Sequence, residues 1–357
     1  MSDGPISYAD AGVDIDAGER AVELMKSSVA KATRPEVVGG LGGFAGLFKL
    51  DLTKYREPLL ASSTDGVGTK IAIAQAMGIH HTVGIDLVAM VVDDLVVCGA
   101  EPLFLQDYIA CGRVDPERIA SIVSGIAEGC RRSGCALVGG ETAEHPGLME
   151  PDHYDLAATG VGVVEAADVL GPERVRSDDV VIAMASSGLH SNGYSLVRHV
   201  LLERSGVPIR TALEAEVPEL GGRRLGDELL VPTRLYTLPC LSAIRAAGGG
   251  IHGFSHVTGG GLADNLARVI PPHLDAEVDR ASWTVPPVFR LVAERGQVPT
   301  PEIERTLNMG VGMVALVAPD AVDVVLQTLA QHDVPAWVAG RVLEGTGAVR
   351  LVGDHPA

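Results

Sequence analysis

The longest apolar stretch of the chain runs from Leu87 to Ala100, and two adjacent acids, Asp93 and Asp94, interrupt it. A membrane-spanning helix needs about 20 apolar residues with few charges, so the pattern argues against a membrane segment. We expect instead a helix over residues 87–98 that is partly apolar on both faces, because the acids sit among Val and Met rather than Lys, Glu or Gln. Asp86, Asp93 and Asp94 are predicted to share one side of it.

A glycine-containing turn precedes this helix and carries an acid, two glycines and a lysine. It reads Ser63-Thr64-Asp65-Gly66-Val67-Gly68-Thr69-Lys70. Carboxylates bind Mg²⁺, glycine N–H groups can approach phosphate oxygens closely, and lysine neutralises the charge that develops in phosphoryl transfer. The turn and the acids behind it therefore predict a metal–nucleotide site, although no Gly-x-x-x-x-Gly-Lys-Ser/Thr motif occurs.

Electrostatics favour the same interpretation of the paired acids. Two carboxylates about 4 Å apart repel each other by ~4 kcal/mol at an effective dielectric constant near 20. A cation would relieve this repulsion, and a proton shared by the two acids would relieve it too. Phosphate-like surroundings favour Mg²⁺, which takes one or two protein carboxylates and completes its shell with water and phosphate.

Length and composition indicate a two-domain α+β protein. The 357 residues exceed one ordinary core, and 46% hydrophobic residues with only 4% aromatics fit a mixture of helices and strands. The expected helices and strands intermix without a strict βαβ rhythm, which favours α+β over a doubly wound sheet. We place the domain boundary near Gly171-Pro172, giving an N-terminal domain of residues 1–170 and a C-terminal domain of residues 171–357.

Charge and cysteine content limit the classes of partner and the cellular compartment that we expect. A formal charge of −18 argues against nucleic acid, whose binding requires clustered Lys and Arg, but it allows a small phosphorylated ligand compensated by Mg²⁺. Five cysteines without a C-x-x-C motif indicate neither a disulfide framework nor a zinc site, and the N-terminus lacks a signal pattern. We therefore expect a cytoplasmic protein with no membrane partner.

The remaining periodicity predicts the main elements. An N-terminal helix should begin at Asp16, with Glu19 completing a capping box. The glycine-rich loop of residues 39–46 allows a weak dinucleotide-binding interpretation, but a flap over a ligand is at least as well supported because no clear strand precedes it. Strands are predicted over 59–62, 136–138, 157–164, 180–185 and 312–317, and further helices over 116–132, 195–203, 262–269 and 321–332.

Three further clusters combine glycines with polar residues. Glu141 follows Gly139-Gly140 at a predicted strand end, where a ligand contact and an ordinary turn are equally supported. The segment 186–193 precedes a helix N-terminus, where anions are favoured; His190 could donate to a carbonyl or phosphate there, although a lone histidine is more often structural. Gly259, Gly260 and Gly261 form a turn that suits either a phosphate cradle or a plain interdomain turn, the cradle being favoured because consecutive glycines are entropically costly.

Seven motifs along nearly the whole chain occur in the order seen in one enzyme family. They are Ser7-Tyr8-Ala9-Asp10-Ala11-Gly12-Val13-Asp14, the loop Gly39 to Gly46, Thr64-Asp65-Gly66-Val67-Gly68-Thr69-Lys70, Gly84-Ile85-Asp86-Leu87-Val88-Ala89-Met90, Gly139-Gly140-Glu141-Thr142, His190-Ser191-Asn192-Gly193-Tyr194-Ser195 and Thr258-Gly259-Gly260-Gly261. In this order they resemble the phosphoribosylformylglycinamidine cyclo-ligases, also called aminoimidazole ribonucleotide synthetases.

The resemblance implies a reaction and an assembly. Formylglycinamidine ribonucleotide and ATP would give aminoimidazole ribonucleotide, ADP and phosphate, with ATP and Mg²⁺ as cofactors, in purine biosynthesis. It also implies a homodimer whose N-terminal domains pair through their sheets, with ATP in the cleft in front of an α+β C-terminal domain.

The resemblance further implies roles for particular residues. The implied catalytic residues are Lys70, Asp94 and His190. The implied ATP-binding residues are Gly42, Gly43, Phe44, Asp65, Gly66, Gly68, Thr69, Lys70 and Glu141. The implied substrate-binding residues are His190, Ser191, Asn192, Gly259, Gly260 and Gly261, and the implied metal ligands are Asp65, Asp86, Asp94 and Glu141. Asp93 departs from the family pattern, which usually has Asn before the conserved-type Asp.

Other functions remain open at this level. A selenophosphate synthetase or a thiamine-phosphate kinase of the same superfamily would share an acidic Mg–ATP site. The first usually carries Cys or selenocysteine in its N-terminal glycine-rich loop, and no cysteine precedes Cys98 here. A non-catalytic nucleotide-binding regulator is a third alternative, against which the intact acids and the lysine argue.

Overall fold

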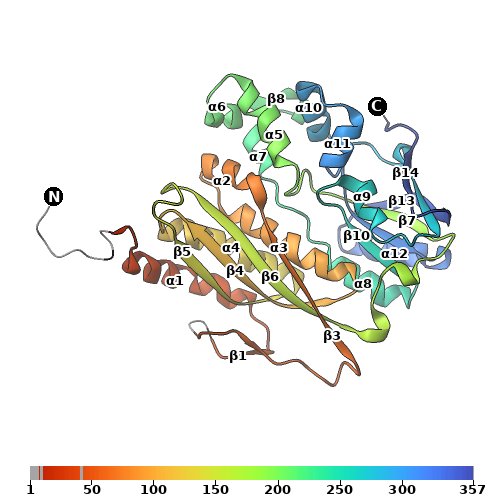
Figure 1. The fold of residues 1–357 in the computed structure, drawn as a ribbon, viewed down its shortest axis with the longest axis horizontal. Coiled ribbons are helices and arrows are strands. Elements are labelled where there is room, and N and C mark those ends of the chain that lie inside the picture. Colours follow the sequence, from red (N-terminus) through yellow and green to blue (C-terminus); the bar gives the residue numbers. More distant parts are fainter. Residues whose placement is uncertain (1–7, 9–10, 41–42, 357) are drawn as a thin grey trace, which may run out of the picture.

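Two large β-sheets, each with its own helices, lie in the two halves of the molecule (Figure 1), and the described residues also form two small two-stranded sheets. The computed structural model describes every residue except 1–7, 9–10, 41–42 and 357. The N-terminal half contains a four-stranded sheet of order β3-β6-β4-β5, and the C-terminal half a six-stranded sheet of order β10-β12-β7-β13-β11-β14. Within the described part of the chain, each strand pairs only with strands of its own half. The α+β two-domain class predicted from the sequence is confirmed.

The N-terminal sheet is covered by helices on one face. Figure 1 shows α3 and α4 behind its strands, and none of the helices formed by the described residues lies in front of them. The outward row Thr64, Thr159 and Gln106 crosses β3, β6 and β4, and all three side chains are exposed. The elements are β3 (Pro58–Gly66), α2 (Ile71–Met77), α3 (His81–Val97), β4 (Glu101–Cys111), α4 (Pro116–Ser133), β5 (Ala136–Glu144) and β6 (Tyr154–Glu165).

The C-terminal sheet is covered on both faces. One face packs on α8 (Thr237–Ala247) and α12 (Val322–Gln331), and the other packs on α9 (Gly261–Ala267). Its strands are β7 (Val180–Ala185), β10 (Ile251–His256), β11 (Leu274–Asp279), β12 (Val311–Val317), β13 (Ala336–Glu344) and β14 (Val349–Val352). The carboxyl ends of β7 and β10 flank the start of β12, so the loops that follow them lie at one edge.

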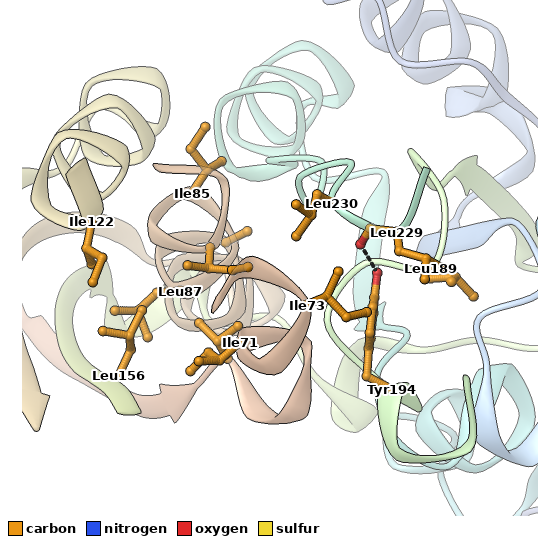
Figure 2. Close-up of a cluster of buried hydrophobic side chains, with 14 of the residues drawn as sticks. Ile71, Ile73, Ile85, Leu87, Ile122, Leu156, Leu189, Tyr194, Leu229 and Leu230 are labelled. Carbon is orange, nitrogen blue, oxygen red and sulfur yellow. Dashed lines mark hydrogen bonds between the residues drawn. The ribbon is translucent and has the colours of Figure 1, made fainter. Parts of the chain in front are cut away.

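A continuous apolar core joins the two halves. Figure 2 shows Ile73 of α2 beside Tyr194 of the C-terminal half, and Ile71 on the side of Leu87 and Leu156, within one apolar cluster. The Tyr194 hydroxyl donates a 2.6 Å hydrogen bond to the Leu229 carbonyl. The helices above this core are α5 (Tyr194–Leu201), α6 (Ile209–Glu214), α7 (Leu225–Leu229), α10 (Pro287–Gly296) and α11 (Thr300–Thr306). The shared core fixes how the two halves face each other.

The predicted capping residue of the first helix, Asp16, is wrong by two residues. Helix α1 (Ile15–Val29) is capped by Asp14, whose side chain accepts a 3.1 Å hydrogen bond from the Ala17 N–H. Asp14 has extended backbone angles, as an N-cap residue requires, whereas Asp16 lies in the first turn and can only interact with the helix dipole.

The other predicted elements are present; β7 has the predicted ends, and the ends of the rest are shifted. The helix predicted over 87–98 begins at His81, and its first turns pack closely on α4: a Cβ at Gly84 would lie 2.4 Å from the Ile122 carbonyl oxygen. Strand β4, which the sequence analysis did not predict, lies between β6 and β5. Within the described residues, no helix has the length and apolarity that a bilayer crossing demands.

Candidate functional site

The three acids of α3 do not share one environment. Asp86 and Asp93 are fully buried, whereas the side chain of Asp94 keeps 44% of its surface exposed. Residues seven apart lie on the same side of a helix, and the next residue lies about 100° further round. The prediction of one shared face is therefore correct for Asp86 and Asp93 and wrong for Asp94.

Asp86 is surrounded by protein donors. Its carboxylate lies 2.8 Å from the Lys70 ammonium and accepts hydrogen bonds from the Thr233 N–H at 2.7 Å and the Thr233 hydroxyl at 2.6 Å. These donors come from both halves of the molecule. The predicted role of Asp86 as a metal ligand does not fit this geometry, because a cation would have to displace the lysine.

Lys70 is equally enclosed. Its Nζ donates to Asp86, to the His190 carbonyl at 2.9 Å and to the Val231 carbonyl at 2.7 Å, and the side chain has no exposed surface. Burial lowers the pKa of Lys70, and the charge of Asp86 opposes that change. Three N–H donors meet three acceptors, so the predicted contact with an ATP phosphate does not fit this geometry.

Asp93 holds the beginning of α8. It accepts hydrogen bonds from the Tyr236 N–H at 3.0 Å and the Thr237 hydroxyl at 2.7 Å. Burial raises the pKa of Asp93 to about 6. The residue that departs from the family pattern therefore serves the contact between α3 and the C-terminal half.

Asp94 faces a cleft between the two halves, where it meets His256 at the end of β10. The His256 Nδ1 donates a 2.9 Å hydrogen bond to Asp94 Oδ1. Burial alone would lower the pKa of His256, but the hydrogen bond to Asp94 and the charges of Asp93 and Asp94 raise it. A cavity of about 330 Å³ borders both residues and is also lined by Ser62, Ser63, Asn265 and Arg268.

Asp65 brings a second carboxylate to Asp94 from the end of β3. Burial raises the pKa of Asp65, and the nearby charge of Asp94 raises it further, while the 2.7 Å hydrogen bond from the Gly66 N–H lowers it. Two carboxylates fit Mg²⁺, which commonly takes one or two from the protein. Because no group of three or more metal-ligating side chains occurs among the described residues, the other ligands of such an ion would be water or phosphate oxygens.

The segment 186–193 follows β7 and lies at the same cleft. His190 has a left-handed backbone with φ 61°, and its Nε2 accepts a 3.1 Å hydrogen bond from the Ser187 N–H. Burial lowers the pKa of His190 well below its ordinary value. The imidazole is therefore neutral and carries its proton on Nδ1.

Unpartnered polar atoms gather around this segment. Among the described residues they include Ser186 Oγ, His190 Nδ1, Ser191 Oγ and His256 Nε2, each buried without a hydrogen-bond partner. A buried polar group left unpaired costs about 1–3 kcal/mol, so such groups mark places where a ligand or water completes the bonding. Asn192 lies beside them and donates to the Met90 sulfur at 3.8 Å.

The glycine turn before α9 has mainly structural reasons for its composition. Gly260 and Gly261 have φ angles of 99° and 72°, and a Cβ at Gly261 would lie 1.7 Å from the Glu304 carbonyl oxygen. Gly259 differs, because a Cβ there would meet Asn192 at 3.9 Å. The structure thus brings Gly259 to the predicted substrate loop and explains the other two by backbone geometry and packing.

The turn before α2 supports the cleft from the N-terminal side. A Cβ at Gly66 would lie 2.9 Å from the Leu156 carbonyl oxygen, and Gly68 has a left-handed φ of 70°. Thr69 Oγ1 lies 3.2 Å from Ser195 Oγ at the start of α5. These residues connect β3 to the C-terminal half, and nothing in their contacts identifies a nucleotide.

Glu141 lies away from Asp65 within one chain. Asp65, Ala158, Asp107 and Gly140 form one row across the sheet, so Gly140 and the adjacent Glu141 are three strands from Asp65. At about 4.8 Å per strand this separation is about 14 Å, too far for one ion to bind both acids of the same chain. Of the predicted metal ligands, Glu141 therefore lies apart from Asp65 and cannot bind the same ion within one chain.

Glu141 instead lines a second cavity, of about 380 Å³, with Gly43 and Phe44. Its walls are mostly apolar and come from α1, α4 and β5; Gly42 lies outside the described residues. Asp107 also lines it, and burial raises the pKa of this acid to about 7. Three of the predicted ATP-binding residues thus meet at one cavity.

Sequence reasoning gave no role to His256 or Asp107. His256 lies two residues before Thr258, where the Thr-Gly-Gly-Gly turn begins, and Asp107 interrupts an apolar run, so both carried a local signal. Thr233 and Tyr236 carried none, because their contacts with α3 depend on how the two halves meet.

Comparison with known proteins gives two family matches. Residues 47–164 match the AIR synthase related protein, N-terminal domain, and residues 176–352 match the AIR synthase related protein, C-terminal domain. A curated relative from Carboxydothermus hydrogenoformans, named phosphoribosylformylglycinamidine cyclo-ligase, is 48% identical over 340 residues, covering 95% of this chain and 97% of the relative.

Solved structures with lower identity have the same fold. Thiamine-monophosphate kinase from Stenotrophomonas maltophilia K279a has a TM-score of 0.65 at 19% identity and covers 94% of this chain and 97% of its own. The hydrogenase maturation protein HypE in complex with ATP has a TM-score of 0.65 at 18% identity, covering 96% of this chain and 93% of its own.

Proposed function

This chain belongs to the AIR synthase related family, and on that premise we propose that it is an ATP-dependent cyclo-ligase of purine biosynthesis. It converts formylglycinamidine ribonucleotide to aminoimidazole ribonucleotide with release of ADP and phosphate. The observation that carries this conclusion is the identity of about half of all residues, over nearly the full length of both chains, with relatives of that name.

The chemistry explains why the reaction needs ATP. The formyl amide carbon is a poor electrophile and its oxygen a poor leaving group. Transfer of the γ-phosphoryl group to that oxygen makes it a good leaving group. An amidine nitrogen then attacks the carbon, the C–O bond breaks, and phosphate leaves with the former amide oxygen.

We assign the metal-binding role to Asp65 and Asp94. Bound Mg²⁺ would neutralise charge on the phosphates during transfer. Asp94 is partly exposed, its orientation is fixed by His256, and the charge of Asp65 lies beside it. Asp86 and Lys70 are left out of this assignment because each is enclosed by protein partners.

The substrate side of the proposal consists of His190, Ser191, Asn192 and Gly259. The neutral His190 offers an Nδ1–H donor, and the Ser191 hydroxyl is likewise without a partner among the described residues. Such donors suit carbonyl and phosphate oxygens. The cavity lined by Gly43, Phe44 and Glu141 is assigned to part of the nucleotide, since its apolar walls suit a base.

A homodimer and a cytoplasmic location belong to the same proposal. The uncovered face of the N-terminal sheet supports the dimer, because Leu60 on its edge strand is 68% exposed and Tyr108 on β4 is 42% exposed. Pairing of this face between two chains would bury both residues. Sedimentation at micromolar concentration should give the mass of two chains, and the mass of one chain would contradict the dimer.

The activity is tested with purified protein, formylglycinamidine ribonucleotide, ATP and Mg²⁺. We expect aminoimidazole ribonucleotide and ADP in equal amounts. A parallel reaction with thiamine monophosphate as acceptor should release no ADP above background. Absence of ADP release that depends on the ribonucleotide would refute the cyclo-ligase assignment, and release with thiamine monophosphate alone would favour a kinase.

A further inference from the structure

We propose that Lys70 is a positioning residue for the ribonucleotide substrate: from the N-terminal half, its buried ammonium holds the 186–192 loop in the conformation that presents His190, Ser191 and Asn192 to the cleft. The inference rests on the proposed function, which makes this loop a substrate contact. It gives Lys70 a different part from the phosphate contact that its motif predicts.

Each hydrogen bond of the ammonium leads to the C-terminal half. Two are direct, to the carbonyl oxygens of His190 at 2.9 Å and Val231 at 2.7 Å. The third goes to Asp86, whose carboxylate in turn accepts both hydrogen bonds from Thr233. The ammonium of Lys70, in the turn before α2, is therefore connected by hydrogen bonds to two separate segments of the other half.

The bond to the His190 carbonyl fixes a backbone that otherwise has little reason to form. A φ of 61° lies in the left-handed region, which is disfavoured for a residue with a Cβ. The ammonium fixes the direction of the carbonyl on one side of His190, and the Ser187 N–H fixes the ring on the other. The orientation of this peptide also sets the orientation of the next two residues, Ser191 and Asn192.

The segment 231–236, whose Val231 carbonyl accepts a hydrogen bond from Lys70, also supports the 186–192 loop. The Ser187 hydroxyl donates to the Pro232 carbonyl at 2.7 Å, and the Tyr236 hydroxyl donates to the Ala185 carbonyl at 2.8 Å. Because Lys70 and Asp86 anchor Val231 and Thr233, loosening them disturbs the loop at both of its ends.

A charged group suits this task because of what it leaves behind when removed. An apolar side chain in place of Lys70 would leave two buried carbonyl oxygens unpaired, and the backbone would move to find new donors. The ammonium has no N–H left for ATP. Its removal should therefore weaken ribonucleotide binding and leave nucleotide binding nearly unchanged.

The test uses the double variant Lys70→Met/Asp86→Asn in the full-length protein, which removes both buried charges together. Calorimetry measures the Kd of a non-hydrolysable ATP analogue, and then the Kd of formylglycinamidine ribonucleotide in its presence. We expect ribonucleotide affinity to fall about tenfold or more, and analogue affinity to change by less than about threefold. Hydrogen exchange at the Ser187 amide should become faster without any ligand.

The matched control is Asp275→Asn/Arg350→Met, which likewise removes both charges of an ion pair, here at the far edge of the C-terminal sheet. This control should change neither Kd. If the double variant of Lys70 and Asp86 does not fold, Thr233→Val removes one bond to Asp86 and should weaken ribonucleotide binding in the same direction by a smaller factor.

Three results would overturn the inference: weaker analogue binding with unchanged ribonucleotide binding, equal weakening of both, or unchanged exchange at Ser187. Wild-type protein that fails to turn over the ribonucleotide would instead refute the proposed function. The exchange measurement needs no substrate, so it still decides whether Lys70 holds the loop.

Discussion

Aspartates on two sides of helix α3 have different roles. On one side of α3, Asp86 and Asp93 are buried, and their oxygens are bonded to Lys70, Thr233, Tyr236 and Thr237. On the other side Asp94 is half exposed and has His256 and Asp65 as neighbours. The comparison teaches that an acid in an apolar helix is identified by the donors around it: where protein donors satisfy it, it joins domains, and where it faces a cleft, it is available to a ligand.

The largest expected effect is on folding, from Asp86→Ala. This change leaves the Lys70 ammonium buried without its counter-ion, and breaking a buried pair in this way costs about 3–5 kcal/mol. Urea denaturation should show that loss in the free energy of unfolding. A loss below about 1 kcal/mol would mean that the buried side of α3 does not hold the domains together.

The next effect is on catalysis, from Asp94→Asn. The variant keeps the volume of the side chain and an oxygen for His256, so the midpoint of thermal unfolding should stay within a few degrees of wild type. Turnover at saturating substrate should fall by about 10²–10³-fold, as is usual when a charged group that stabilises the transition state is lost. Near wild-type turnover at limiting Mg²⁺ would remove Asp94 from the metal site.

The third effect is on stability and concerns Asp93, the neighbour of Asp94 on α3. Asp93→Asn keeps an oxygen for the Tyr236 N–H and the Thr237 hydroxyl, so its stability should stay within about 1 kcal/mol of wild type. Asp93→Leu leaves both donors unpaired and should cost about 2–3 kcal/mol. Equal stability of the two variants, measured by denaturation, would contradict the joining role of Asp93.

The smallest effect comes from an ion pair outside α3, which serves as a reference. Burial alone would raise the pKa of Glu304, but Arg280 and His355 lower it to about 2. The unfolded-state value is near 4.3, so the stabilisation is complete above that pH and is lost as the pH falls from about 4.3 toward 2. Glu304→Gln should cost about 1–2 kcal/mol at pH 7 and nothing near pH 2; an effect independent of pH would contradict the ion pair.

Much of the fold could be predicted because its signals are local. The periodicity of α4 and α12 and the apolar run of β7 each stand within one stretch of sequence, and those elements appear where they were expected. Helix α3 begins earlier than predicted, and its first turns pack closely on α4 at Gly84. The arrangement of β4 between β6 and β5 depends on pairing across the chain, which periodicity does not encode.

The sequence patterns selected residue types for a candidate site but did not indicate which partners those residues have. Helical phasing placed Asp86 and Asp93 together correctly, but no local pattern indicated that carbonyl oxygens of the other half would enclose Lys70. The separation of Glu141 from Asp65 follows from the order of strands in the sheet. What sequence reasoning lacked was the register between segments more than 50 residues apart.

The most direct test of the account compares Asp93→Asn with Asp94→Asn in their requirement for Mg²⁺. Turnover of formylglycinamidine ribonucleotide is measured against Mg²⁺ concentration at fixed ATP, and Mn²⁺ binding to each variant is followed by electron paramagnetic resonance. The account predicts that Asp93→Asn behaves like wild type in both measurements, whereas Asp94→Asn needs at least about tenfold more metal. Equal metal requirements in the two variants would contradict the division between the two sides of α3.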